Sequence, residues 1–156
     1  MRRLVICSCG FALIALLNGC SRKPASLERR DPSKDPREAA THGDARAQFE
    51  FGVRILNSVG NIPDYAEAAE WFRKAAEQGH PGAQAALGFL YHRGHGVPQA
   101  DVEAYKWLTL AIKGYTDKNQ DRLVQARNDL ATLAKRMSSA QISEAERRAK
   151  AFNPTP

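Results

Sequence analysis

The sequence predicts an all-α fold: a short α-solenoid of stacked helix pairs, closed by capping helices at its C-terminal end. From about residue 37 to 115 the chain repeats itself at a spacing of 36 residues, and a period of this length is typical of helical solenoids. Within each period, small and apolar residues recur at helical spacing in two segments. About two repeats would leave an apolar end uncovered, so the helices that follow are expected to cap the stack.

The segment before the repeat is predicted to contain a signal and a tether. Arg2 and Arg3 precede an apolar stretch that ends in a small residue and then Cys20. This is the order of a secretory signal, and the apolar part is shorter than the roughly 20 residues that span a bilayer. A cysteine at this point resembles a bacterial lipobox, which implies that residues 1–19 are cleaved off and that Cys20 is acylated. An uncleaved anchor or an ordinary secretory signal is the alternative. Residues 20–36 are polar and proline-rich, so we expect a flexible linker.

The composition of the chain bears on two questions: whether it binds nucleic acid and whether disulfides stabilise it. The chain has 23 basic and 17 acidic residues, a formal net charge of +6, and these charges are dispersed. No basic stripe with interleaved aromatics occurs, so nucleic-acid binding is not expected. Cleavage would remove Cys7 and Cys9 and leave Cys20 as the only cysteine of the mature chain. A lipidated thiol cannot form a disulfide. The core alone is then expected to hold the fold.

The two predicted helices of each period are marked by residues that start and stop helices. The first helix is expected at about 45–58 and 81–93, and the second at about 65–78 and 101–114. Proline suits the first position of a helix, so Pro81 marks a start. The glycines that follow the helices tolerate the left-handed backbone conformation of a helix end.

Residues 116–156 are expected to form the cap and a short tail. A polar loop is predicted at 116–121, followed by a helix over 122–137 that carries apolar residues at helical spacing. Ser138 begins a capping box for a last helix, which is expected to end near Phe152 before a proline.

The ordered pattern of residues at 37–115 resembles the Sel-one-like repeat, a relative of the tetratricopeptide repeat. Its residues in the second copy are Ala83, Leu87, Gly88, Tyr91, Gly96, Ala104, Trp107 and Ala111. Those in the first copy are Ala47, Gly52, Ala68, Trp71 and Ala75. The resemblance implies a right-handed solenoid in which these residues form the structural core. The first copy departs from the pattern with Phe51 for leucine and Ile55 for tyrosine, and the second has Tyr115 where glycine is expected.

The resemblance also implies that the first helices line the concave side of the solenoid. A stripe beside their packed positions consists of Phe49, Val53 and Leu56, with Phe89 and His92 in the second copy. Such a stripe could form a groove for a partner helix or an extended peptide. The alternative is that Phe49 and Phe89 pack on the half-copy in front and on the capping helices.

Neither catalysis nor metal binding is expected. His92 and His95 lack a third Cys, Asp or Glu at ligand spacing, whereas a catalytic zinc site needs three protein ligands. We therefore predict a solvated histidine pair. No nucleophile elbow and no phosphate-binding glycine loop occur in the sequence. No catalytic residue, no metal and no cofactor are predicted.

The leading functional hypothesis is a monomeric, lipid-anchored scaffold or adaptor that binds another protein or peptide in the bacterial envelope. Ser21 follows the acylated cysteine, and under the usual sorting rule this favours the outer membrane, facing the periplasm. Two alternatives stay open: an enzyme or enzyme accessory related to peptidoglycan or β-lactams, and a structural or stress lipoprotein without a dedicated ligand. The identity of a partner does not follow from a repeat scaffold.

Overall fold

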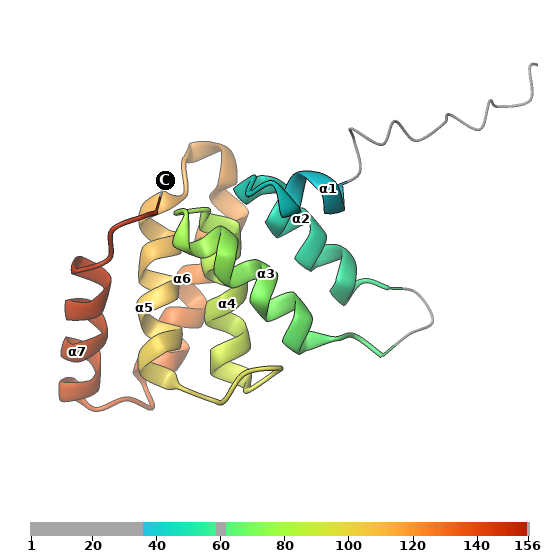
Figure 1. Cartoon of the computed structure of the whole chain (residues 1–156). Coiled ribbons are helices and arrows are strands. Elements are labelled where there is room, and N and C mark those ends of the chain that lie inside the picture. The colour runs from blue at the N-terminus through green and yellow to red at the C-terminus, as the bar shows by residue number, and fades with distance from the viewer. Residues whose placement is uncertain (1–35, 59–61, 156) are drawn as a thin grey trace, which may run out of the picture. The chain divides into compact units, whose positions relative to one another are not determined.

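The structure is a computed structural model that describes residues 36–58 and 62–155, and every regular element within these ranges is helical (Figure 1). In chain order the elements are α1 (Pro36–Thr41), α2 (Ala45–Leu56), α3 (Tyr65–Glu77), α4 (Pro81–Arg93), α5 (Asp101–Gly114), the 3₁₀ helix η2 (Asp117–Asn119), α6 (Gln120–Ala134) and α7 (Ser139–Lys150). The predicted all-α fold is confirmed. The predicted signal, Cys20 and nearly all of the predicted linker lie outside the described residues.

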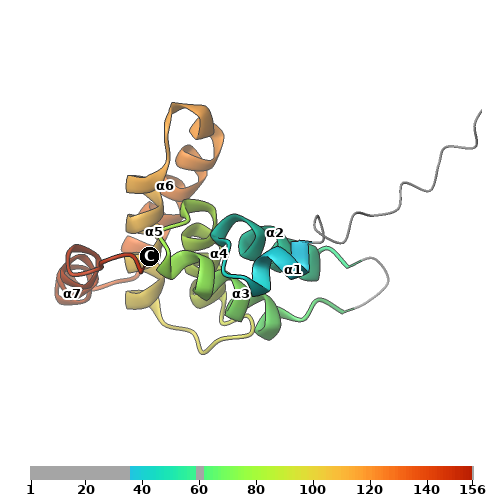
Figure 2. The ribbon, with the colours of Figure 1, turned by 45° about the horizontal axis from the view of Figure 1, so that its top comes forward.

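The helices stack as consecutive antiparallel pairs in a short right-handed solenoid. The pair α2–α3 is followed by the pair α4–α5, and α3 packs against both α2 and α4. Helix α6 packs on α5 and reaches α4, while α7 packs on α5 alone among the major contacts (Figures 1 and 2). These last two helices cap the C-terminal end of the stack, as predicted.

The first helix of each pair begins at a side chain that accepts a backbone hydrogen bond. Asp44 Oδ1 accepts from the N–H of Ala47 at 2.6 Å, and His80 Nδ1 accepts from the N–H of Ala83 at 3.1 Å. These bonds satisfy one of the free N–H groups at a helix start. Helix α5 starts without such a bond because Ala100 occupies its N-cap position.

Helix α1 is the remnant of a preceding second helix, so the predicted half-copy is present. The carboxamide Nε2 of Gln48 donates to the carbonyl of Ala40 at 3.2 Å. One repeat later, Nε2 of Gln84 donates to the carbonyl of Ala76 at the same distance of 3.2 Å. Each buried glutamine thus ties the start of one pair to the end of the helix before it.

The core consists of two clusters. The larger one lies among α2 to α5, around fully buried residues such as Phe72 and Leu87. The smaller one joins α5 to α6 and α7, around Leu108 and Leu133. The predicted core residues that are buried are Ala47, Gly52, Ala68, Ala75, Ala83, Leu87, Gly88, Ala104, Trp107 and Ala111. Trp71 and Tyr91 are half-buried and Gly96 is exposed.

Two glycines set the spacing between the helices of each pair. A Cβ atom on Gly52 would lie 2.6 Å from Cε1 of Phe72, and one on Gly88 would lie 2.9 Å from Cγ of Leu108. Each glycine costs about 1 kcal/mol of helix propensity relative to alanine. The close packing of a large side chain against the bare backbone offsets that cost.

The repeat ends at Tyr115, and the residues that follow differ in part from the prediction. Tyr115 adopts an extended backbone (φ −74°, ψ 140°), where the preceding copies turn through a glycine of positive φ. The predicted loop at 116–121 contains η2, and α6 already begins at Gln120. The capping box of Ser138 is confirmed, since both of its reciprocal hydrogen bonds with Gln141 are present.

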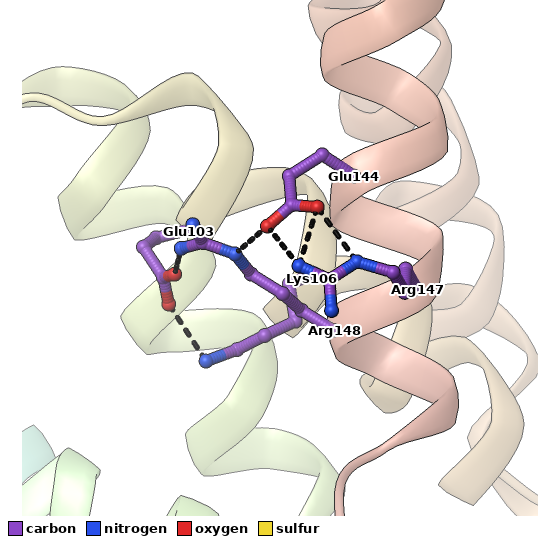
Figure 3. Close-up of polar contacts among 5 residues, drawn as sticks. All are labelled: Glu103, Lys106, Glu144, Arg147 and Arg148. Atoms are coloured by element: carbon purple, nitrogen blue, oxygen red, sulfur yellow. Dashed lines mark hydrogen bonds and ion pairs between the residues drawn. The ribbon is translucent and has the colours of Figure 1, made fainter.

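A chain of ion pairs joins α7 to α5 (Figure 3). Glu103 on α5 binds Lys106 at 2.6 Å and also Arg148 of α7, while Glu144 binds both Arg147 and Arg148. Burial raises the pKa of Glu103, but its bonds to Lys106 and Arg148 outweigh burial and hold that pKa below its ordinary value. The pairing therefore weakens as the pH falls through this lowered pKa.

Candidate functional site

A small pocket lies where α4 faces α5 and α6. Its lining consists of Phe89, His92 and Arg93 from α4, Leu108 from α5, and Asp129 and Thr132 from α6. The cavity measures about 90 Å³, enough for part of one side chain. Phe89 is 43% exposed, and the guanidinium carbon of Arg93 lies 5.5 Å from the centre of its ring. The pocket thus offers an aromatic face, a cation and a carboxylate to a partner.

The structure brings two of the five predicted binding residues to this pocket, Phe89 and His92. Phe49 instead stacks on the ring of His80, with centroids 4.7 Å apart and an interplanar angle of 29°. Val53 and Leu56 are partly buried against the larger core cluster. These three residues therefore lie at the edge of the core rather than in the lining of the Phe89 pocket.

His92 and His95 are partly buried, so the prediction of a solvated pair is wrong. The Nδ1 atoms of both histidines are buried and have no hydrogen-bond partner within the described ranges. His92 Nδ1 lies 3.9 Å from Oδ1 of Asp101, whose Oδ2 pairs with Arg136 at 3.5 Å. The ring of His95 packs on Tyr65 with centroids 4.7 Å apart. The turn after α4 thereby packs against the start of α3.

Residues 36–58 and 62–155 show neither a metal site nor a membrane-spanning helix. No group of three or more Cys, His, Asp or Glu side chains that could hold a metal ion occurs in these ranges. None of the described helices has the length and apolar character needed to cross a membrane. Cys20 is outside the described residues.

The sequence did not reveal Asp129 and Thr132, which complete the pocket from α6. Helix α6 follows the end of the 36-residue period, so no equivalent position existed from which to infer its neighbour. The helical spacing of its apolar residues predicted a buried face, and Leu133 does lie fully buried on it. Only the structure shows which polar residues of α6 lie next to α4.

The comparisons with families and relatives agree on the repeat. The model described as "Sel1 repeat" matches residues 45–80 and 81–114. Over 74 residues the chain is 43% identical to an exopolysaccharide production negative regulator of Rhizobium leguminosarum bv. viciae, covering 47% of this chain and 26% of that protein. The protein of the same name from Rhizobium meliloti (strain 1021) is 41% identical over 76 residues, which are 48% and 27% of the two chains. The chain thus spans about a quarter of the length of these curated relatives.

Two solved structures share the fold. One is a protective antigen of uropathogenic Escherichia coli strains that displays an SLR fold, with a TM-score of 0.63 and 31% identity, over 75% of this chain and 24% of that chain. The other is a Sel1 repeat protein of Oxalobacter formigenes, with a TM-score of 0.50 and 38% identity, over 58% and 26% of the two chains.

These similarities identify the repeats of the chain. Sel1 repeats mediate protein–protein interaction and generally serve as non-enzymatic scaffolds. Each matched segment contains one helix pair of the structure: α2 and α3 lie within residues 45–80, and α4 and α5 lie within residues 81–114. The chain therefore carries two consecutive Sel1 repeats and folds as a short Sel1-type α-solenoid.

Proposed function

We propose that the protein is a lipid-anchored adaptor of the bacterial envelope that holds a partner protein on the surface formed by α4 and α6. The observation that carries the binding surface is Phe89, a large aromatic side chain that is 43% exposed at the mouth of a pocket. Large aromatic residues are frequent anchors of protein interfaces. The Sel1 repeats support a protein as the partner.

The anchor in this proposal is Cys20, and its support is the pattern of the sequence. A basic start, a short apolar stretch and a small residue precede that cysteine, as in bacterial lipoproteins. Ser21 after the acylated residue favours the outer membrane, so the solenoid would face the periplasm on a polar linker. The linker would let the binding surface search a volume near the membrane.

The relatives named as regulators of exopolysaccharide production share only the repeat-bearing quarter of their length with this chain. Their named role belongs to proteins that extend well beyond the matched segment. We therefore propose the binding step alone, and not a role in exopolysaccharide production.

Site-specific photocrosslinking tests the binding surface. A photoreactive phenylalanine analogue replaces Phe89 in cells, and a second variant carries it at Val124, which is 51% exposed and is not part of the pocket lining. We expect a discrete adduct with one protein from position 89 and none from position 124. Equal adducts from both positions, or no adduct from position 89, would overturn the proposed surface.

The anchor is tested separately, by fatty-acid labelling and by the processing of the precursor. The wild-type chain should incorporate labelled fatty acid, and Cys20→Ser should lose the label and accumulate unprocessed. If Cys20→Ser is labelled and processed like the wild type, the anchor is refuted while the binding surface is unaffected.

A further inference from the structure

A second pocket, which shares no lining residue with the Phe89 pocket, lies at the ends of α5 and α7, beside the start of α4 and the C-terminal tail. It measures about 440 Å³ and opens to solvent. The tail forms one wall, because after α7 the chain returns toward α3, where the N–H of Thr155 donates to the carbonyl of Glu77 at 2.9 Å (Figure 1). Lining residues include Gln84, Leu110, Lys113, Gly114, Lys150 and Phe152.

The equivalent position in the first repeat shows what this pocket lacks. There, Nε2 of Gln78 donates to Oε1 of Gln48 at 2.8 Å. The carboxamide of Gln48 is oriented by its other bond, in which Nε2 donates to the carbonyl of Ala40. Both polar atoms of this buried side chain are thereby satisfied.

In the second repeat one of these bonds has no donor. Gln84 keeps the orienting bond from its Nε2 to the carbonyl of Ala76, but Gly114 stands in the place of Gln78 and has no side chain. Within residues 36–58 and 62–155 no protein group donates to Oε1 of Gln84. Gln84 is only 3% exposed and lines the pocket. Oε1 of Gln84 is not among the fully buried polar atoms without a partner, so it faces the open pocket. A ligand N–H that reaches this carbonyl can take the place of water there.

The remaining lining sets the chemistry of that ligand. Lys113 and Lys150 are exposed cations at the pocket, and no acidic side chain belongs to its described lining. Leu110 and Phe152 supply apolar surface. The carboxamide of Gln78 in the first repeat shows that an amide N–H is the donor that fits such a glutamine.

We propose that this pocket binds an extended, acidic peptide segment of a partner protein. A backbone N–H of the peptide donates to Oε1 of Gln84, and its carboxylates pair with Lys113 and Lys150. The apolar part of the segment lies on Leu110 and Phe152. This site is independent of the surface around Phe89, so either can fail without the other.

The test uses the full chain and a defined probe, an octapeptide of alternating alanine and glutamate. Fluorescence anisotropy measures its binding, and ¹H–¹⁵N spectra follow the side-chain amide of Gln84 and the backbone amide of Gly114. We expect both resonances to shift with this peptide and not with its alanine–lysine counterpart. Binding that leaves Gln84 unperturbed, or equal binding of the lysine peptide, would overturn the proposal.

Variants at Gly114 separate occupation of the pocket from damage to the fold. Gly114→Gln recreates the arrangement of the first repeat and should abolish peptide binding. Gly114→Ala places the same Cβ atom, 3.0 Å from Cβ of Pro81, and should bind peptide like the wild type. A thermal melt reports whether either variant unfolds. Unchanged binding by a folded Gly114→Gln chain would refute the site.

Charge reversal keeps the proposal testable if both Gly114 variants unfold. Lys113→Glu combined with Lys150→Glu should weaken binding at least about tenfold, whereas Lys118→Glu with Lys135→Glu, at exposed positions outside the pocket, should leave it within about twofold. Equal loss in both pairs would show unspecific attraction and overturn the site. Vesicles of anionic phosphatidylglycerol are titrated in parallel. If they shift Gln84 and Gly114 while the peptide does not, the site recognises a membrane and the peptide proposal is wrong.

Discussion

At the scale of single residues, two glycines in the turn after α4 have the same backbone conformation but different amounts of space around them. Gly94 and Gly96 have nearly identical positive φ angles, +68° and +69°, which L-residues rarely adopt. Their surroundings differ. A Cβ on Gly96 would lie 2.3 Å from the carbonyl carbon of Tyr65, whereas one on Gly94 would lie 3.3 Å from Cβ of Gln99. Gly96 is exposed, so the prediction that it is a buried core residue is wrong. Its absent side chain instead lets the turn contact the backbone of Tyr65 closely.

This difference predicts unequal effects of alanine at the two positions. Gly94→Ala should cost about 1–2 kcal/mol through backbone strain alone. Gly96→Ala should cost about 2–4 kcal/mol, because the turn must also move away from the start of α3. Urea unfolding of both variants measures the difference. Equal losses would show that the contact between the turn and α3 contributes nothing.

His80 makes the start of α4 sensitive to pH. Burial lowers its pKa, and Arg122 and Arg46 lower it further against the opposing effects of Glu50 and Asp44. The capping bond also requires an unprotonated Nδ1, since that atom accepts the N–H of Ala83. The unfolded chain therefore binds a proton more readily than the folded chain does. The contribution of His80 to stability is complete above its ordinary pKa of about 6.5 and is lost as the pH falls through that value toward the lowered one.

We expect the wild type to lose stability between about pH 7 and 5, and His80→Asn to lose less of it. Asparagine is a good N-cap that does not titrate in this range. His42→Asn, at an exposed residue near the end of α1, serves as the matched control and should keep the pH dependence of the wild type. Denaturant midpoints across this range provide the measurement. A steeper slope for His80→Asn than for the wild type would contradict the assigned role.

At the scale of elements, α7 is attached to α5 by ion pairs and by the apolar residue that follows it. Arg148 pairs with Glu103 and Glu144, but its side chain is 45% exposed, and exposed pairs contribute about 0–1 kcal/mol each. Phe152 packs edge-on against Trp107 with ring centres 5.6 Å apart. Trp107 is only 5% exposed beside it. Apolar burial is therefore the larger attachment.

Phe152→Ala should consequently destabilise the chain more than Arg148→Ala does. We expect about 1.5–3 kcal/mol for the loss of the phenylalanine and a smaller loss for the arginine, because its ion pairs are exposed to solvent and Lys106 still pairs with Glu103. Thermal unfolding and the fluorescence of Trp107 measure both effects. A larger loss in Arg148→Ala would show that the ion pairs dominate.

The same scale shows how far the sequence could predict this molecule. The limits of α4 and α5 followed from Pro81, the glycines after α4 and the apolar spacing, because local signals decide where a helix begins and ends. The pairing of Gln84 with Ala76 was not predicted, since both residues are buried but nothing local states which carbonyl a carboxamide reaches. Asp129 could not be placed in the Phe89 pocket, because α6 lies beyond the period and its packing depends on long-range contacts.

For the whole molecule, the stacked arrangement predicts a graded stability along the chain. In a solenoid each unit contacts its neighbours, so stability depends on intrinsic and nearest-neighbour contributions. Helices α4 and α5 have packed neighbours on both sides, whereas α1 has six residues and packs on α2 alone among the major contacts. Local opening should therefore begin at α1 and reach α4 and α5 last.

Native-state hydrogen exchange tests this gradient. In the wild type we expect the slowest amides in α4 and α5 and the fastest helical amides in α1. A chain truncated after residue 138 loses α7 and the tail, which uncovers Trp107 and the α5 side of the larger core cluster. Exchange should then accelerate most in α5, less in α4 and least in α2, because the lost contacts border α5 directly. Equal acceleration in α2 and α5 would instead mean that the two repeats unfold as one cooperative unit.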